Sequence, residues 1–228
     1  MVVKKETIRG GGLQFSPSTL TTGRPGGTVR LAIEADEGLV KDFLYIFQKG
    51  FCLETAHSAT VRSILSATLG LSADYVARRV TTIFLDGKPV DNLDTPVHDR
   101  ATLSLSGAMP GLVGAAMRSG GPLSGMRASI SFASTGITEG SRTIRVKLFN
   151  VVLHDVGRKL LARGILVEPS AFLETMERLP ARWWERCTQV AFNGKAVGAL
   201  PSPHLLISDG TACVLLSVTA DRDDPRCP

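Results

Sequence analysis

The sequence has few of the features that mark a catalytic or cofactor-binding site. Its four cysteines include no C-x-x-C pair, and none has a histidine at metal-ligand spacing. The four histidines are scattered, and no G-x-S-x-G motif is present. His98–Asp99 and His154–Asp155 are adjacent pairs, and adjacent side chains diverge on a strand or a helix. We therefore expect no metal, no cofactor and no enzymatic activity.

Phosphate-binding and membrane-spanning signals are missing as well. The two Gly-Lys pairs are followed by Pro89 and Ala196 and lack the earlier glycine of a P-loop. No apolar run approaches the 18 residues or so of a membrane helix, and the N-terminal stretch has no apolar core of a signal peptide. The sequence predicts a cytoplasmic protein with no membrane partner.

The net charge of +5 is not distributed as nucleic-acid binding requires. The basic excess lies in residues 1–27 and 114–145, whereas residues 28–113 and 146–228 are close to neutral. Phosphate-backbone binding needs a basic stripe on a folded face. We therefore expect no nucleic-acid partner.

What the sequence does contain is an internal repeat. Residues 28–33 read TVRLAI and residues 143–148 read TIRVKL, and GFCLET from Gly50 corresponds to GILVEP from Gly164. The closest correspondence is DGKPVDNLDTP at 86–96 with NGKAVGALPSP at 193–203. A repeat of this length indicates duplicated domains, because solenoid units run to roughly 20–50 residues.

The repeat and the composition divide the chain into five parts. Residues 1–27 and 114–141 are rich in glycine and small polar residues, which predicts a flexible arm and a linker. Residues 28–113 and 142–220 are the two copies, and 221–228 form a polar tail. Each copy is small, so docking between them would help to stabilise both.

The sequence pattern of each copy predicts the same order of elements: strand, helical link, strand, helix, strand, turn, strand. In the first copy the strands are 29–33, 51–55 and 102–106, and the main helix is capped by Ser58 and stopped by Gly70. In the second copy the corresponding strands are 143–149, 165–167 and 212–218, and the main helix runs from a Ser170 cap to Pro180. Asp86-Gly87 and Asn193-Gly194 predict tight turns that accept positive φ. The main helix would bury one stripe against a mixed sheet, which is an α+β arrangement.

Trp183 and Trp184 are the only tryptophans and have charged neighbours on both sides. One interpretation is packing, with one ring under the end of the helix and the other over the sheet edge. The alternative is a partner-binding anchor, because paired tryptophan with arginine is typical of interfaces. Cys52 and Cys213, in contrast, are expected to be buried thiols of apolar strands, and Cys227 an exposed one.

This series of elements resembles the β-grasp fold, and more narrowly the ubiquitin-like sulfur-carrier family of the molybdopterin-synthase small subunit and the thiamine-pathway sulfur carrier. The resemblance covers most of both copies. It rests on residues 61–65, 83–90, 99 and 103–110 of the first copy, and 172–173, 190–197, 209–211 and 214–216 of the second. The fold class that it implies is α+β, with two tandem β-grasp (ubiquitin-like) domains, each a mixed sheet with one main helix.

In that family, activity resides in a terminal Gly-Gly whose carboxylate a partner enzyme adenylates. A tail without Cβ atoms can enter a narrow channel and place its carboxylate in line with the α-phosphate. The present sequence has no glycine after Gly210, and its only Gly-Gly after a complete copy is the internal Gly120-Gly121. The resemblance therefore implies processing, either near Thr219, Ala220, Asp221 and Arg222 or after Gly121.

Three functions follow from the resemblance. The first is a ubiquitin-like protein modifier, similar to the two-domain modifiers of bacterial antiviral conjugation operons, with an E1-like adenylating enzyme, an E2-like or peptidase partner and a target protein. The second is a sulfur carrier that is released by cleavage after Gly121. The third is a non-conjugated β-grasp binding module that engages a protein through Trp183 and Trp184 or a sheet face.

Overall fold

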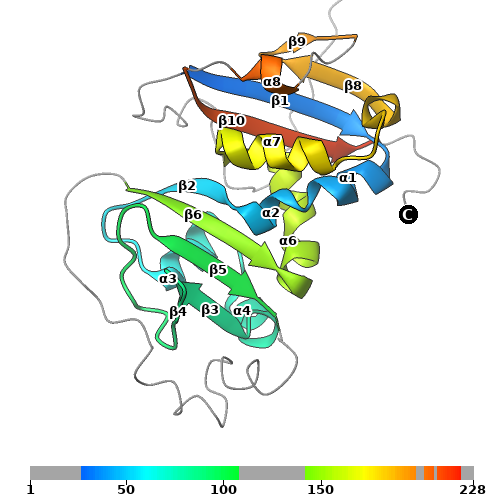
Figure 1. The fold of residues 1–228 in the computed structure, drawn as a ribbon. Helices are drawn as coiled ribbons and strands as arrows, with labels where there is room; N and C mark the ends of the chain where they lie inside the picture. Colours follow the sequence, from blue (N-terminus) through cyan, green and yellow to red (C-terminus); the bar gives the residue numbers. More distant parts are fainter. Residues whose placement is uncertain (1–26, 108–141, 199–202, 208–209, 222–228) are drawn as a thin grey trace, which may run out of the picture.

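The computed structural model describes residues 27–107, 142–198, 203–207 and 210–221 of the 228-residue chain. Ten strands form one mixed sheet in the order β4-β3-β5-β6-β2-β7-β10-β1-β8-β9 (Figure 1). In chain order the strands are β1 (Gly27–Ala35), β2 (Phe51–Thr55), β3 (Thr82–Leu85), β4 (Lys88–Pro89), β5 (Thr102–Ser106), β6 (Arg142–Phe149), β7 (Ile165–Val167), β8 (Cys187–Phe192), β9 (Lys195–Ala196) and β10 (Thr211–Ala220).

Helices follow or connect these strands. They are α1 (Glu37–Phe43), α2 (Ile46–Lys49), α3 (Val61–Ser63), the π-helical turn η2 (Ile64–Thr68), α4 (Ala73–Arg79), α6 (Asn150–Arg163), α7 (Pro169–Arg178), the 3₁₀ turn η4 (Trp183–Arg186) and α8 (Pro203–Leu206). The predicted α+β class is confirmed.

The two copies exchange their first strands. Strand β1 of the first copy pairs in parallel with β10 and antiparallel with β8, which both belong to the second copy. Strand β6 of the second copy pairs in parallel with β5 and antiparallel with β2 of the first copy. Each half of the sheet, β4 to β2 and β7 to β9, is thus completed by a strand from the other copy (Figure 1).

The two repeated turns show what β1 replaces. In the first copy, the amide of Asp86 donates to the carbonyl of Thr102 at 2.9 Å, and Asp86 Oδ1 accepts from the amide of Thr102 at 2.8 Å. In the second copy, Asn193 makes the same two bonds with Arg30 of β1, at 2.8 and 2.9 Å. Strand β1 therefore takes, beside β8, the place that β5 takes beside β3.

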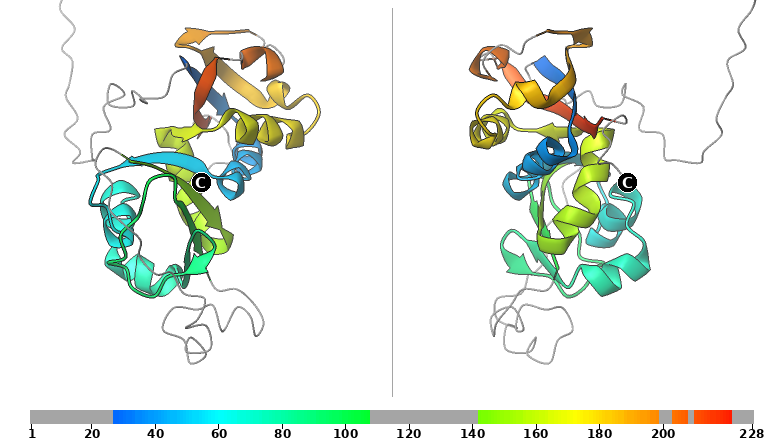
Figure 2. Two further views of the ribbon diagram at one scale, coloured as in Figure 1. Left: turned by 60° about the vertical axis from the view of Figure 1, so that its left-hand side comes forward. Right: turned by 90° about the vertical axis from the view of Figure 1, so that its right-hand side faces the viewer.

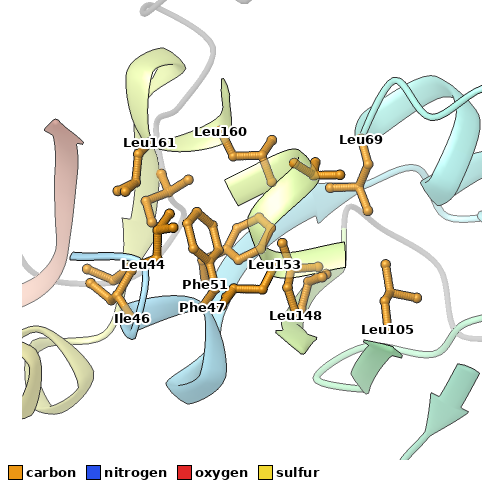
Figure 3. Close-up of a cluster of buried hydrophobic side chains, with 14 of the residues drawn as sticks. Leu44, Ile46, Phe47, Phe51, Leu69, Leu105, Leu148, Leu153, Leu160 and Leu161 are labelled. Atoms are coloured by element: carbon orange, nitrogen blue, oxygen red, sulfur yellow. The ribbon is translucent and has the colours of Figure 1, made fainter. Parts of the chain in front are cut away.

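Two helical links carry the chain from one half of the sheet to the other. Helices α1 and α2 lead from β1 to β2, and α6 leads from β6 to β7 (Figure 2). They pack closely where α6 has Gly157, because a Cβ atom there would lie 3.0 Å from Leu44 Cδ2 and 3.2 Å from Phe47 Cδ2. Figure 3 shows Leu44, Phe47 and Leu161 in the buried cluster between these links.

One hydrophobic core runs through both halves. It joins Leu31 and Phe43 of the first copy to Leu148, Phe172 and Val218 of the second in a single contact cluster. Two separate tandem β-grasp domains with boundaries at 28–113 and 142–220 are therefore not confirmed. The physical reason is that each half lacks a central strand until the other copy supplies it, and copies this small gain stability from burying more surface together.

The local predictions are largely confirmed, with three differences. The first main helix is capped by Thr60, not Ser58, in a box in which the Thr60 side chain accepts from the Ser63 amide and the Ser63 side chain accepts from the Thr60 amide. Helix α7 begins at Pro169, one residue before the predicted cap Ser170. Helix α4, capped by Ser72, was not predicted and accounts for extra length in the first copy.

Candidate functional site

The two tryptophans have different environments. Trp183 is 7% exposed and packs edge-on against Phe43 of α1, with ring centroids 6.2 Å apart. Trp184 is 51% exposed, and among the described residues no other large hydrophobic side chain is classed as exposed. Arg182, with φ of 62°, begins the η4 turn that places the two consecutive rings in these two environments. Of the two predicted partner-binding residues, Trp184 alone is available to a partner.

An open hollow of about 350 Å³ lies beside Trp184. Its apolar walls come from Trp184, Val190 and Val197. The remaining lining residues belong to β8, β9 and the residues that follow β9, and they are Cys187, Thr188, Gln189, Ala196 and Gly198. The volume is at the lower end of the range of ligand pockets, roughly 300–1,000 Å³.

The hollow lies along an incompletely paired strand. Strand β9 pairs only with Ala191 and Phe192 of β8, and the amide of Val197 then donates to the carbonyl of Val190 at 2.9 Å. Toward Cys187, the outer side of β8 has no neighbouring strand in the part of the chain that the structure describes. Thr188 and Gln189 on this stretch are exposed.

The corresponding edge of the first copy is shorter. Strand β3 begins at Thr82, which pairs with Ser106 and is fully buried. Its outer side is covered by β4, up to a bond from the amide of Val90 to the carbonyl of Ile83 at 2.9 Å. The sequence repeat aligns Thr82 with Gln189 and Ile83 with Val190. Over the described residues, the two copies therefore differ in length at this edge: β3 has Thr82 alone before Ile83, whereas β8 has residues 187–189 before Val190.

An ion pair between the copies holds the η4 turn in place. Arg186 donates to both carboxylate oxygens of Asp36 at 2.7 Å, and to Asp42 at 3.2 Å. Asp36 also accepts from the amide of Leu39 at 2.9 Å and caps α1. The Arg186 hydrogen bonds, and more weakly the helix amides, lower the pKa of Asp36 to about 2.

Cys187 is not a candidate nucleophile. Desolvation by burial, with a smaller contribution from the nearby Asp36 carboxylate, raises the pKa of this thiol to about 11. A thiol with such a pKa is protonated at neutral pH, and the thiolate is the nucleophilic form. Cys52 and Cys213 are buried, as predicted, while Cys227 lies outside the described residues.

The processing candidates are only partly described. Thr219 and Ala220 belong to β10 and pair with Glu34 and Ala35 of β1. The amide of Asp221 donates to the carbonyl of Ala35 at 2.8 Å. Arg222, Gly120 and Gly121 lie outside the described residues. A cut at Thr219 or Ala220 would thus remove residues that are part of the sheet.

Sequence reasoning missed the partner of His98, which it treated as isolated. His98 Nε2 lies 2.6 Å from Asp86 Oδ2, and Nδ1 lies 2.8 Å from the carbonyl oxygen of Asp99. Both ring nitrogens face acceptors, an arrangement that suits the imidazolium, and these two contacts raise the pKa of His98. The group joins the repeated turn to the start of β6, where Asp99 Oδ1 accepts from the amide of Thr143 at 2.9 Å. We interpret it as a structural connection.

The hollow and the unpaired stretch of β8 were also missed. The repeat does differ nearby, since the first copy has Pro89 in its short edge strand β4, where β9 of the second has Ala196. Proline on an edge strand is a common means of blocking further pairing. This substitution concerns the outer edges of β4 and β9, so it gives no signal for the unpaired stretch of β8.

Comparison with known protein families, with curated proteins and with solved structures found no match to this chain. Over the described ranges, no three side chains of histidine, cysteine, aspartate or glutamate are grouped so as to hold a metal ion. The same ranges include no helix with the length and apolar character needed to cross a membrane.

Proposed function

We propose that the protein is a non-enzymatic, ubiquitin-like binding module that engages a partner protein through the surface around Trp184. The observation that carries the proposal is the 51% exposure of Trp184 beside an apolar hollow, on an otherwise well-packed structure. Tryptophan is the residue type most enriched among binding hot spots, and leaving its ring in water costs free energy that a partner recovers.

The sheet supports a β-grasp relationship in altered form. In each half, a parallel central pair (β5–β6 or β10–β1) is flanked by antiparallel neighbours. A mixed sheet with a parallel central pair supports the family resemblance, although here each central pair is drawn from both copies. Members of such a fold differ widely in function, so the function is argued from the Trp184 surface.

To test this proposal, short linear peptides from a random display library are selected for binding to the full chain. Peptides that also bind the Trp184→Ala variant are then removed. Because half of the Trp184 side chain is exposed, this variant is expected to keep the fold. Peptides that bind the wild type and lose affinity for the variant are the expected result. If exhaustive selection yields only peptides that bind both chains equally, the Trp184 surface is not a binding site and the proposal fails.

A second candidate function is a protein modifier that an E1-like enzyme adenylates at a processed C-terminal carboxylate. The pairing of the C-terminal strand favours a cut on the C-terminal side of these residues, because Thr219, Ala220 and Asp221 all bond or pair with β1. A peptidase that spares the described sheet would cut after Asp221. Intact-mass measurement on protein made with its genomic neighbours tests this, and full-length protein that is never joined to a target excludes it.

The sulfur-carrier alternative is less favoured. Release of the first copy by cleavage after Gly121 would have to withdraw β1 from between β10 and β8, and leave β5 and β2 without β6. Each loss opens a central position of the sheet and exposes apolar core residues. The strand exchange therefore opposes the liberation of an independent carrier.

A further inference from the structure

We propose that the outer edge of β8, from Cys187 to Val190, binds an extended segment of the partner as an added strand, with one apolar side chain of that segment in the hollow beside Trp184. The inference rests on the proposed function, because it uses the Trp184 surface. It goes further by naming the conformation and the chemistry of the partner segment.

The hydrogen-bonding capacity of the edge favours an added strand. Within the described residues, the outer side of β8 is paired at Ala191 and Phe192 and ends with the bond from Val197 to the carbonyl of Val190. The adjoining stretch toward Cys187 is in strand conformation without an outer neighbour. Exposed strand edges of this kind are templates for an incoming strand, since main-chain groups supply the affinity.

The shape and chemistry of the hollow favour an apolar side chain as its occupant. Successive side chains of a strand point to opposite faces of the sheet. An added strand would therefore direct every second side chain toward Trp184. The walls at Trp184, Val190 and Val197 are apolar, and the hollow of about 350 Å³ accommodates a side chain of leucine or phenylalanine size. The partner segment is therefore expected to carry an aliphatic or aromatic residue at this register.

Charged residues near the hollow favour a particular neighbour for the apolar side chain. Exposed Lys195 precedes the lining residue Ala196 on β9, and exposed Arg182 precedes the η4 turn that bears Trp184. Arg182 forms an ion pair with Glu185, which offsets one of the two positive charges. The remaining positive charge complements an acidic residue beside the apolar one in the partner segment.

The first copy provides the internal contrast. At the matching positions, β3 begins with a buried threonine, and β4 carries Pro89 at its edge. In the second copy β8 begins earlier, and its residues 187–189 have no outer strand among the described residues, close to the exposed Trp184. That combination is a liability for aggregation unless a partner covers it.

The experiment uses the Trp184-dependent peptides selected on the full chain, resynthesised with single N-methyl groups at each backbone position. An added strand predicts alternation: methylation of amides that face β8 weakens binding by ~30-fold or more, whereas methylation of the intervening amides has little effect. Trp184→Ala is expected to weaken binding by a similar factor. Lys195→Ala is expected to weaken the binding of acidic peptides at low salt, and Lys88→Ala, its counterpart in the first copy, serves as the control without effect.

The outcomes separate the two proposals. Trp184-dependent peptides whose binding ignores N-methylation overturn the added strand and leave the proposed function standing, with a helix or a lone side chain as the occupant. Absence of any Trp184-dependent peptide overturns both. Self-association of the full chain that disappears in Trp184→Ala also overturns the inference, because the edge is then occupied by a second copy of this chain.

Discussion

The carboxylate of Asp36 accepts two hydrogen bonds of 2.7 Å from the guanidinium of Arg186, a residue of the other copy 150 positions away. Arg186 immediately precedes β8 and closes the turn that bears Trp184, while Asp36 caps the helix that leads out of β1. The main chain joins the same two residues, since the amide of Asp36 donates to the carbonyl of Arg186 at 3.1 Å. The candidate binding edge is therefore held in place by the strand exchange itself.

Asp36→Asn tests this ion pair through pH. The pKa of Asp36 is lowered to about 2 by Arg186, against about 4 in an unfolded chain, so its stabilisation is present above pH 4 and is lost as the pH falls toward 2. Asparagine retains the capping oxygen, which isolates the charge. We expect Asp36→Asn to lose about 1 kcal/mol in urea unfolding at pH 7, after allowance for partial solvent exposure. A difference from wild type that stays constant down to pH 2 would contradict the assignment.

Substitution of the two tryptophans is expected to change stability by very different amounts. Trp183→Ala removes a buried ring that packs against Phe43, and we expect it to lower the free energy of unfolding by about 3–5 kcal/mol. Trp184→Ala removes an exposed ring, and a change within about 0.5 kcal/mol is expected. Thermal and urea unfolding of the pair provide the measurement. Equal losses would show that Trp184 is a core residue, and its use as a binding anchor would be wrong.

Local elements could be predicted from the sequence because their causes are local. Alternation predicts β1 and β6, the Asp86-Gly87 and Asn193-Gly194 turns are found with positive φ, and Gly70 ends its helix at φ of 69°. The exchange of strands could not be predicted, because residues 28–33 and 143–148 are so similar that each pattern suits either place in the sheet. The exchange is accompanied by close packing of the two links at Gly157, a long-range contact that no periodicity encodes.

The candidate site could be predicted only in part, for a similar physical reason. Composition alone singled out Trp183 and Trp184 but could not tell which ring is exposed, because that depends on the backbone of Arg182 and on Phe43 of the other copy. The unpaired stretch of β8 depends on where β8 begins, because β9 and β4 pair with their inner neighbours over equivalent positions. Strand length is a property that residue preferences specify weakly.

Gly157→Leu tests the crossing of the two links. A side chain at this position meets Leu44 and Phe47, and overpacking of this kind costs about 1–3 kcal/mol, although leucine is the better helix former. We expect a single unfolding transition at lower urea concentration, because both halves share the crossing. His154→Ala, at an exposed position on the same helix, is the control and should be neutral. Two separate transitions in wild-type protein would contradict a shared core.

Asp86→Asn converts the first turn to the residue found in the second. Asparagine at position 193 accepts the equivalent amide bond, from Arg30, so the turn is expected to survive the change. The pKa of His98 is raised first by the carbonyl of Asp99 and further by the Asp86 carboxylate, and removal of that charge should lower it toward 6.5. Because the folded-state pKa of His98 is raised, its contribution to stability is present below about pH 6.5 and is lost as the pH rises through that higher value. NMR titration of the His98 ring in both proteins measures the shift, and an unchanged pKa would exclude the carboxylate contact.

A cut between the copies tests the strand exchange directly. Five of the nine strand pairings in the described sheet join different copies: β1–β10, β1–β8, β2–β6, β2–β7 and β5–β6. A site-specific protease sequence inserted after Gly121 and then cleaved should give two fragments on a denaturing gel. Under native conditions they should remain one particle, because separation would expose the apolar faces of β1 and β6 together with their unpaired backbone groups.

The control for this experiment compares fragments that fold separately before mixing with fragments that are refolded together. Fragments that are produced separately and then mixed from the folded state are expected to associate poorly, whereas fragments refolded together should recover the native mass and unfolding profile, since each contributes a central strand to the other's half. Fragments that part without denaturant and remain folded would mean that each copy keeps its own first strand. The sheet would then consist of two independent halves, and the Asp36–Arg186 bond would not anchor the Trp184 edge across the copies.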